Sequence, residues 1–305
     1  MTASAPDRQG PMDAFRGDRV YLGADHARNE RRTWIVAAVC LATLAAQIGG
    51  GLIFNSMALI ANGFHMGAHV AALVVAAGAY GLARRFAHDP RFSFGTGKLG
   101  YLAGFANAAV LAVSAVLVAV ESGRHLLAPS PVAYDGALAL AAAALAVNLV
   151  CMWLLRPAAG HAHDQDGDLN LSAAHLHLAG DAAISALAMV GLGLGRVFDW
   201  PWADSLAGLA GAALLAHFAY RLLVRTGAVL LDVNPSPELT AEIGRRLGRE
   251  GERLIDLHLW RLGPGHHAAI VVIEAQAPQD AGAYRARLAG LPGLSHVTVE
   301  TRQTR

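Results

Sequence analysis

Charged residues are scarce in this chain. Only 15% of its 305 residues are Asp, Glu, Lys or Arg, while 54% are hydrophobic. Soluble domains carry about 25% charged residues, so most of this chain is expected to lie in lipid. The formal net charge is +1, and there is no basic stripe interleaved with aromatic residues. Nucleic acid is therefore not expected as a partner.

Cysteine is also nearly absent. The two cysteines, Cys40 and Cys151, both fall in apolar runs. Two residues cannot make a disulfide framework, and we expect both to pack as small apolar side chains.

The signatures of two enzyme classes are missing as well. A zinc peptidase carries His-Glu-x-x-His, in which Glu is the general base, whereas Met66 follows His65 here. The segment from Gly95 to Lys98 lacks the spacing of a Walker phosphate loop. We therefore expect a protein that is not an enzyme and that uses neither ATP nor an organic cofactor.

Long apolar runs dominate what is present. Crossing the hydrocarbon core of a bilayer takes about 20 apolar residues in a helix. Six segments qualify, at residues 33–54, 57–83, 99–120, 132–155, 171–195 and 203–224. Their many Ala and Gly residues allow close packing of helices in lipid. The sequence predicts a mainly α membrane protein with a six-transmembrane-helix bundle over residues 31–231.

The first 30 residues are polar and are interrupted by Pro and Gly. They lack the apolar core of a signal peptide, and we interpret residues 1–30 as a flexible cytosolic tail.

Basic residues indicate how the bundle is oriented. One set lies before the first segment, between the second and third, after the fourth and at the end of the sixth: Arg28, Arg31, Arg32, Arg84, Arg85, Arg91, Lys98, Arg156, Arg221 and Arg225. The opposite connections hold only Arg124 and Arg196. By the positive-inside rule, both termini face the cytoplasm, and we expect an integral protein of a bacterial inner (plasma) membrane.

The composition changes after Asp232, where Pro235 and Pro237 mark a boundary. Residues 238–250 predict a polar helix, 255–260 an alternating strand, 269–275 a second strand, 281–288 a short helix and 295–301 a last strand. This α-β-β-α-β order predicts a small α+β ferredoxin-like cytosolic domain over residues 232–305. A domain of this size buries little surface and would be steadier as a dimer.

Two pairs of metal-binding residue types repeat one spacing inside the apolar runs. His65 and His69 are four residues apart, as are His177 and Asp181. Residues i and i+4 share one face of a helix, so two facing helices could bring three imidazoles and one carboxylate to one point. Ionisable groups at membrane depth usually mark an ion path, and this donor set suits a divalent transition metal.

Other residues are weaker candidates as metal ligands. Asn62 and Asn148 could supply extra ligands to the intramembrane ion or could join neighbouring helices by hydrogen bonds. His161 and His163, in the fourth connection, could collect metal weakly or belong to a solvated linker. In the cytosolic domain, Asp256, His258, His266 and His267 could form a regulatory metal site, or could be solvated or packed.

The donor set narrows the cargo to a group of metals. Imidazole-rich sites suit Co²⁺, Ni²⁺, Cu²⁺ and Zn²⁺, whereas Mg²⁺ and Ca²⁺ require oxygen ligands. Histidine has an ordinary pKa of about 6.5 and binds metal only when deprotonated. Protons are therefore expected to act as the counter-substrate.

Four segments resemble those of the cation diffusion facilitator family of divalent metal exporters. These are SMALIANGFHMGAH at 56–69, FSFGTGK at 92–98, LHLAGDA at 176–182 and DLHLWRLGPGH at 256–266. The resemblance implies a homodimer with six spans per subunit, exchange of a cytosolic cation for external protons, and a cytosolic domain that dimerises. Zinc exporters of the family typically carry Asp at the position of His69. A second His there resembles the branch that exports cobalt and nickel.

Two alternatives stay open. The protein could be a zinc or cadmium exporter of the same family, or a membrane metal sensor that binds a cation without moving it. A flux measurement distinguishes a transporter from a receptor.

Overall fold

The computed structural model describes residues 21–22, 25–53, 57–128, 134–155, 169–200, 202–249 and 251–304. Within helices α1 and α2, the side chains of residues 47, 50–53, 57–66, 68 and 69 lie outside the described part. The N-terminal tail up to residue 20 and the fourth connection, which holds His161 and His163, also lie outside it.

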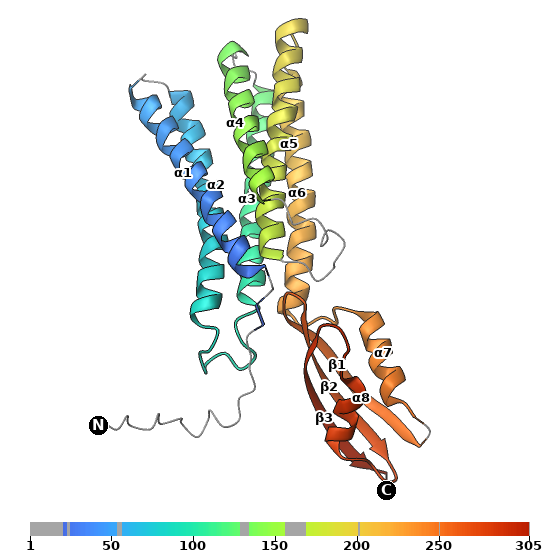
Figure 1. The fold of residues 1–305 in the computed structure, drawn as a ribbon. Helices are drawn as coiled ribbons and strands as arrows, with labels where there is room; N and C mark the ends of the chain where they lie inside the picture. Colours follow the sequence, from blue (N-terminus) through green and yellow to red (C-terminus); the bar gives the residue numbers. More distant parts are fainter. Residues whose placement is uncertain are drawn as a thin grey trace, which may run out of the picture.

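Six long helices form an elongated bundle (Figure 1). They are α1 (His26–Ile53), α2 (Met57–Arg85), α3 (Leu99–Leu127), α4 (Tyr134–Leu155), α5 (Leu169–Phe198) and α6 (Trp202–Leu230). Among the described residues, α3, α4, α5 and α6 are long and apolar enough to cross a membrane. The mainly helical architecture that the sequence predicted is thus present.

The outer surface of the bundle carries many large apolar side chains. Val116 and Leu117 on α3, Trp153 on α4 and Val190 on α5 are each about 60% exposed. Exposure of this extent is unfavourable in water but is expected on a surface that faces lipid.

The first helix begins earlier than the apolar run predicted. Helix α1 starts at His26, so residues that we expected in the flexible tail are helical. Polar contacts to α2 explain the extension: His26 Nε2 is 3.0 Å from the Tyr80 carbonyl oxygen, and the Arg84 guanidinium donates to Glu30 at 3.1 Å. Apolar periodicity does not detect such contacts.

Aromatic rings crowd the turn between α5 and α6. The Phe198 and Trp200 ring centroids are 5.4 Å apart, and the Trp200 and Trp202 rings stack at 5.2 Å. All three side chains are exposed. Tryptophan is enriched where membrane meets water, so this turn has the composition of a bilayer surface.

The C-terminal part has the α-β-β-α-β order that the sequence predicted. It consists of α7 (Pro237–Leu247), β1 (Glu252–Gly263), β2 (His266–Ala275), α8 (Ala281–Leu288) and β3 (Leu294–Gln303). In the sheet, β2 lies between β1, to which it is antiparallel, and β3, to which it is parallel. Its core includes Ile243 of α7, Ile273 of β2 and Tyr284 of α8, none of which is exposed.

Strand β1 departs from simple alternation at Ile255. The register slips between Leu254, which pairs with Ile273, and Asp256, which pairs with Val272. Leu254 and Leu257 pack against the core, whereas Ile255 is 36% exposed. The side chain of Ile255 therefore does not join Leu254 and Leu257 in the core, because a bulge adds one residue to the strand and turns this side chain outward.

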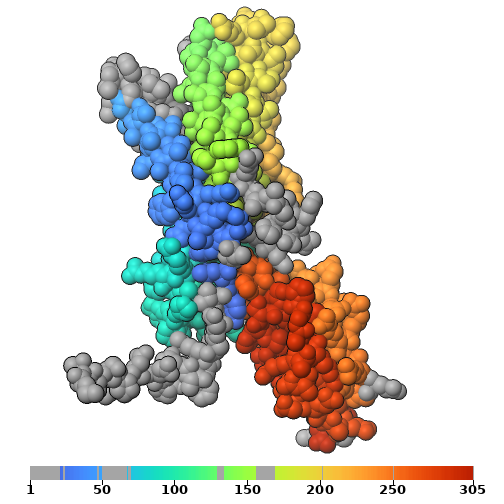
Figure 2. Space-filling view, in the orientation of Figure 1, coloured from blue at the N-terminus to red at the C-terminus, as the bar shows by residue number. Residues whose placement is uncertain are grey.

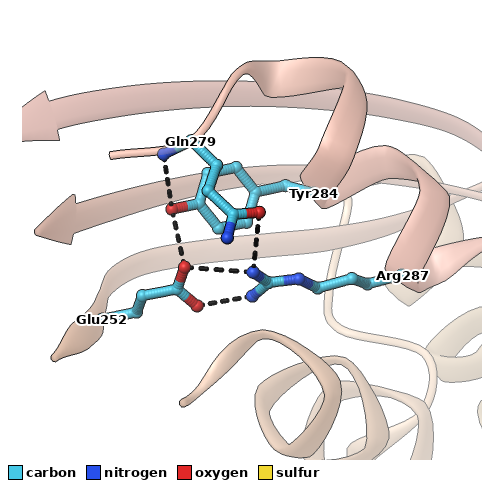
Figure 3. Close-up of polar contacts among 4 residues, drawn as sticks. All are labelled: Glu252, Gln279, Tyr284 and Arg287. Atoms are coloured by element: carbon cyan, nitrogen blue, oxygen red, sulfur yellow. Dashed lines mark hydrogen bonds and ion pairs between the residues drawn. The ribbon is translucent and has the colours of Figure 1, made fainter. Parts of the chain in front are cut away.

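A polar network fastens β1 to α8 (Figure 3). Arg287 forms a two-pronged ion pair with Glu252, and the Tyr284 hydroxyl donates to the same carboxylate at 3.0 Å. Gln279 accepts from Arg287 at 3.0 Å and donates its backbone N–H to Tyr284 at 3.2 Å. The hydrogen bond from Arg287 is the main reason why the pKa of Glu252 lies below its ordinary value.

The loop before α3 joins the bundle to the sheet, and Figure 2 shows the two parts in contact. Lys98 forms an ion pair with Asp232, just after α6. The Phe94 ring contacts Trp260 of β1 edge-on, with centroids 5.6 Å apart. At Gly97, a Cβ atom would lie 2.8 Å from Gly263 Cα and 2.8 Å from the Tyr21 carbonyl oxygen. We call the meeting of these three segments at Tyr21, Gly97 and Gly263 the junction.

Candidate metal centre

One face of α5 is buried along the first half of the helix and carries two ionisable residues. His177 is 4% exposed and Asp181 is 7% exposed. Asn170, Ala173, Ala174 and Gly180 are buried on the same stretch. The small residues let neighbouring helices approach closely, so the two ionisable side chains lie inside the bundle and not on its outer surface.

His177 and Asp181 face each other across one helical turn. The His177 Nε2 atom is 3.7 Å from Asp181 Oδ2. This separation is longer than a hydrogen bond but brings an imidazole nitrogen and a carboxylate oxygen close enough for one cation to contact both. The Ser185 hydroxyl donates a hydrogen bond to the backbone carbonyl oxygen of Asp181 at 2.8 Å, and not to the Asp181 carboxylate.

Helix α2 is continuous through positions 65 and 69. Because the two positions are one turn apart, they share a helix face. The side chains of His65, His69 and Asn62 lie outside the described part of the structure, which gives only the helical backbone at these positions.

A hydrogen bond that the sequence did not predict fixes how far α2 is shifted along the bundle relative to α5. The Asn170 side-chain amide donates to the Ala76 carbonyl oxygen at 2.9 Å. The two helices run in opposite directions along the bundle (Figure 1). Position 69 is seven residues from Ala76 on α2, and His177 is seven residues from Asn170 on α5. Each step corresponds to about 10 Å along its helix, in the same direction along the bundle.

The same count relates the other pair. Position 65 is eleven residues from Ala76, and Asp181 is eleven residues from Asn170. Both steps correspond to about 16 Å along a helix. Positions 69 and 65 on α2 are thus level with His177 and Asp181 on α5, respectively.

Helices α2 and α5 contribute to one apolar cluster near the hydrogen bond between Asn170 and Ala76. Leu73 of α2 shares a buried cluster with Leu171, Ala174 and Leu178 of α5, and Val70 packs against it. Val70 follows position 69 directly, and Leu178 follows His177. The same cluster contains side chains of α1 and α4, so it packs four helices of the bundle together.

Asn148 lies on α4 and is 5% exposed. It is buried in the bundle three residues before Cys151, and Val147 beside it packs against the cluster that holds Leu178. This position is compatible with either of the roles expected from the sequence.

The candidates in the C-terminal part do not gather into one site. Asp256 and His258 contact each other at 3.0 Å on an exposed stretch of β1. His266 Nδ1 lies 2.7 Å from the Ser295 hydroxyl, and His267 is 2% exposed. Within the described residues, no group of three or more His, Cys, Asp or Glu side chains is arranged to hold a metal ion.

His266 has a lowered pKa because burial disfavours its charged form, with His267 adding to the effect. A neutral imidazole at this position fits its packing against the Tyr21 ring, with centroids 5.5 Å apart. The structure thus favours a packing role for His266 beside the junction.

Comparison with known proteins identifies the bundle. The cation efflux transmembrane domain family matches residues 33–231. The chain belongs to the cation diffusion facilitator, or cation efflux, family. The resemblance found in the sequence motifs is confirmed, and the protein is an integral membrane protein of a family of transporters.

Relatives within the cation diffusion facilitator family cover most of the chain. The zinc transporter ZitB of Escherichia coli is 32% identical over 247 residues, which are 77% of this chain and 74% of ZitB. The metal cation efflux system protein CzcD of Cupriavidus metallidurans is 31% identical over 252 residues, or 80% and 77% of the two chains. The cadmium, cobalt and zinc/H(+)-K(+) antiporter of Bacillus subtilis is 27% identical over 251 residues, or 81% and 79%.

Proposed function

We propose that this protein exports divalent transition-metal cations from the cytoplasm through a site formed by His65, His69, His177 and Asp181. The observation that carries the proposal is the buried pair His177 and Asp181 on α5, level with positions 69 and 65 of α2. Three imidazoles and one carboxylate provide the ligand types that zinc-like and cobalt-like ions use. Asn62 and Asn148 are candidate supporting ligands.

The preferred cargo is Co²⁺ or Ni²⁺ in this proposal, with Zn²⁺ as a further substrate. The second histidine, at position 69, supports the cobalt and nickel branch. The names of the relatives favour a second candidate, a zinc or cadmium exporter of the same family, since ZitB is named a zinc transporter. Both candidates use the same four residues and differ in the ranking of metals.

Protons drive the export by competing for the same ligands. Metal binding requires deprotonated imidazole and carboxylate groups, so acid on the external side promotes release of the cation. One relative is named an antiporter that exchanges metal for H(+) and K(+), which supports coupled exchange.

The proposed topology has six spans, α1 to α6, over residues 31–231, with both termini in the cytoplasm and residues 232–305 as the cytosolic domain. Basic residues at one end of the bundle, including Arg84 and Arg85 at the end of α2, support this orientation. We further propose a homodimer in the plasma membrane of a bacterium, because the small sheet has little core of its own.

Transport into sealed, inside-out vesicles tests the site. When the vesicle lumen is acidified, vesicles containing the wild-type protein are expected to accumulate Co²⁺, and the accumulation should disappear when a protonophore is added. His65→Ala and Asp181→Ala should each reduce the initial rate by at least about 100-fold, as expected when one ligand or its support is lost.

His217→Ala is the matched control. His217 also lies in a long apolar helix, α6, but its side chain is exposed on the outside of the bundle. This variant should transport at the wild-type rate. Undiminished Co²⁺ transport in both His65→Ala and Asp181→Ala would reject the assignment of the site. Binding of Co²⁺ without any flux would instead identify a metal sensor.

A further inference from the structure

Helices α1 and α2 run in opposite directions along one flank of the bundle (Figure 1). Polar contacts fix their relative level near the start of α1. The Arg84 guanidinium donates to the Glu30 carboxylate at 3.1 Å, and a Cβ atom at Gly81 would lie 3.7 Å from the same carboxylate. Position 30 of α1 is therefore level with the last turns of α2.

An exposed arginine follows each member of this ion pair. Arg31 comes directly after Glu30, and Arg85 comes directly after Arg84. Because the helices run in opposite directions, a turn of about 100° per residue carries both side chains to the same side of the pair. Arg31 and Arg85 are thus level with each other on one face.

This face is the outer surface of the bundle. Cys40 contacts α4 and is nine residues from Arg31, or about two and a half turns, so the two side chains point in opposite directions. The same interval separates Arg85 from Ala76, which is buried and accepts a hydrogen bond from Asn170 of α5. Both arginines therefore point away from the other helices and towards the surroundings of the bundle.

The two arginines also differ from their neighbours in charge compensation. Three neighbouring arginines form ion pairs: Arg28 with Asp25, Arg84 with Glu30, and Arg91 with Asp89. Within the described part of the chain, neither Arg31 nor Arg85 has a carboxylate at ion-pair distance. The Arg85 guanidinium lies over the Phe86 ring, 5.7 Å from its centroid. Two uncompensated positive charges on one face favour an anionic ligand.

The surface becomes apolar one turn farther into the bundle. Trp34, three residues after Arg31, is 47% exposed, and Leu82, three residues before Arg85, is 48% exposed. A Cβ atom at Gly78 would meet nothing within 4 Å, so the surface beside these side chains is open. A phospholipid matches this arrangement, since its phosphate lies at the level of interfacial arginines and its acyl chains lie below.

We propose that Arg31 and Arg85 bind the phosphate of an anionic phospholipid, whose acyl chains pack against Trp34 and Leu82. Guanidinium groups suit this ligand because they donate paired hydrogen bonds to phosphate oxygens. In the proposed topology the lipid belongs to the cytoplasmic leaflet. The site is separate from the four residues proposed for transport and does not depend on the transported ion.

Native mass spectrometry of the full-length protein in a neutral detergent tests this proposal. Phosphatidylglycerol is expected to bind more tightly than phosphatidylcholine, in which choline compensates the phosphate charge. Arg31→Ala and Arg85→Ala should each weaken phosphatidylglycerol binding by about fivefold, and the double variant by about 25-fold, as expected for one interfacial arginine and for two.

Arg225→Ala is the matched control, because Arg225 is exposed on α6 and its loss removes the same charge at a different place. This variant should bind phosphatidylglycerol as the wild type does, and excess inorganic phosphate should not displace the lipid. Monodisperse elution shows that each variant is folded. Equal binding of the two lipids, equal weakening by Arg225→Ala, or displacement by inorganic phosphate would each overturn the proposal.

Discussion

At the scale of the residue, the four-residue spacing was enough to identify the ionisable pair on α5. His177 and Asp181 are buried on one face of the helix, as that interval predicted. Residues whose role depends on a distant partner could not be found in this way. Asn170 looks like an ordinary polar residue in the sequence, and only its hydrogen bond to Ala76 reveals that it aligns two helices.

The choice of ligand at position 69 should tune the preference among metals. We expect His69→Asp to raise the ratio of Zn²⁺ to Co²⁺ transport by about tenfold, because the zinc exporters that the sequence resembles typically carry Asp at this position. Competition between the two ions in the same vesicles measures this ratio. His217→Asp, on the outside of α6, is the control for the added charge.

Tolerance measurements give an independent check on position 69. An efflux-deficient host that expresses the wild-type protein should grow in higher cobalt, and the host that expresses His69→Asp should lose part of this advantage. Tolerance to zinc alone, unchanged by His69→Asp, would contradict the assignment to the cobalt and nickel branch.

At the scale of the element, periodicity predicted the order of helices and strands but not their ends. The apolar run predicted that the first helix begins at residue 33, whereas α1 begins at His26, where polar contacts to α2 extend it. Alternation predicted a strand at 255–260 but not the bulge that exposes Ile255. In both cases the difference comes from contacts with another element, which a local pattern does not contain.

The network that fastens β1 to α8 should make the C-terminal part sensitive to acid. Since the pKa of Glu252 is lowered in the folded protein from its ordinary 4.5, its contribution to stability is complete above about pH 4.5. That contribution is lost as the pH falls through the lowered pKa. Glu252→Gln removes the charge, so we expect it to cost about 1–3 kcal/mol at neutral pH and to weaken the acid dependence.

Hydrogen exchange in the full-length protein measures this effect, with the protection of β1 and α8 as the readout. Glu300→Gln is the matched control, because Glu300 pairs with Arg302 on an exposed stretch of β3 and surface pairs contribute little. Equal loss of protection in the two variants would show that the network has no special role.

At the scale of the whole molecule, the junction determines how the sheet is attached to the bundle. Gly97 lies in the loop that resembles a family motif, but the motif did not show what the glycine is for. In the structure a side chain at this position would collide with the backbone of Leu262, Gly263 and Tyr21. The requirement is set by three segments that are distant in the sequence, and so it was not predictable from any one of them.

Gly97→Ala should therefore loosen the attachment of the C-terminal part to the bundle. Overpacking of this kind costs about 1–3 kcal/mol, and we expect faster hydrogen exchange in residues 94–98 and at the end of β1. Gly244→Ala, on α7, is the matched control because a Cβ atom there meets nothing within 4 Å. It should leave the junction unchanged and slightly stabilise the helix. Slow exchange in Gly97→Ala, equal to that of the wild type, would contradict the close packing.

The aromatic turn between α5 and α6 bears on the electrical cost of export. Phe198, at this turn, is 17 residues beyond Asp181, or about 25 Å along the helix. With the turn at one surface of a hydrocarbon layer about 30 Å thick, Asp181 lies close to the opposite surface. In the proposed export path, a divalent cation that travels from Asp181 to the aromatic side crosses most of the membrane voltage, against about 4 kcal/mol at 100 mV. In the proposed exchange, the number of protons that return along the same path sets how much of that work remains.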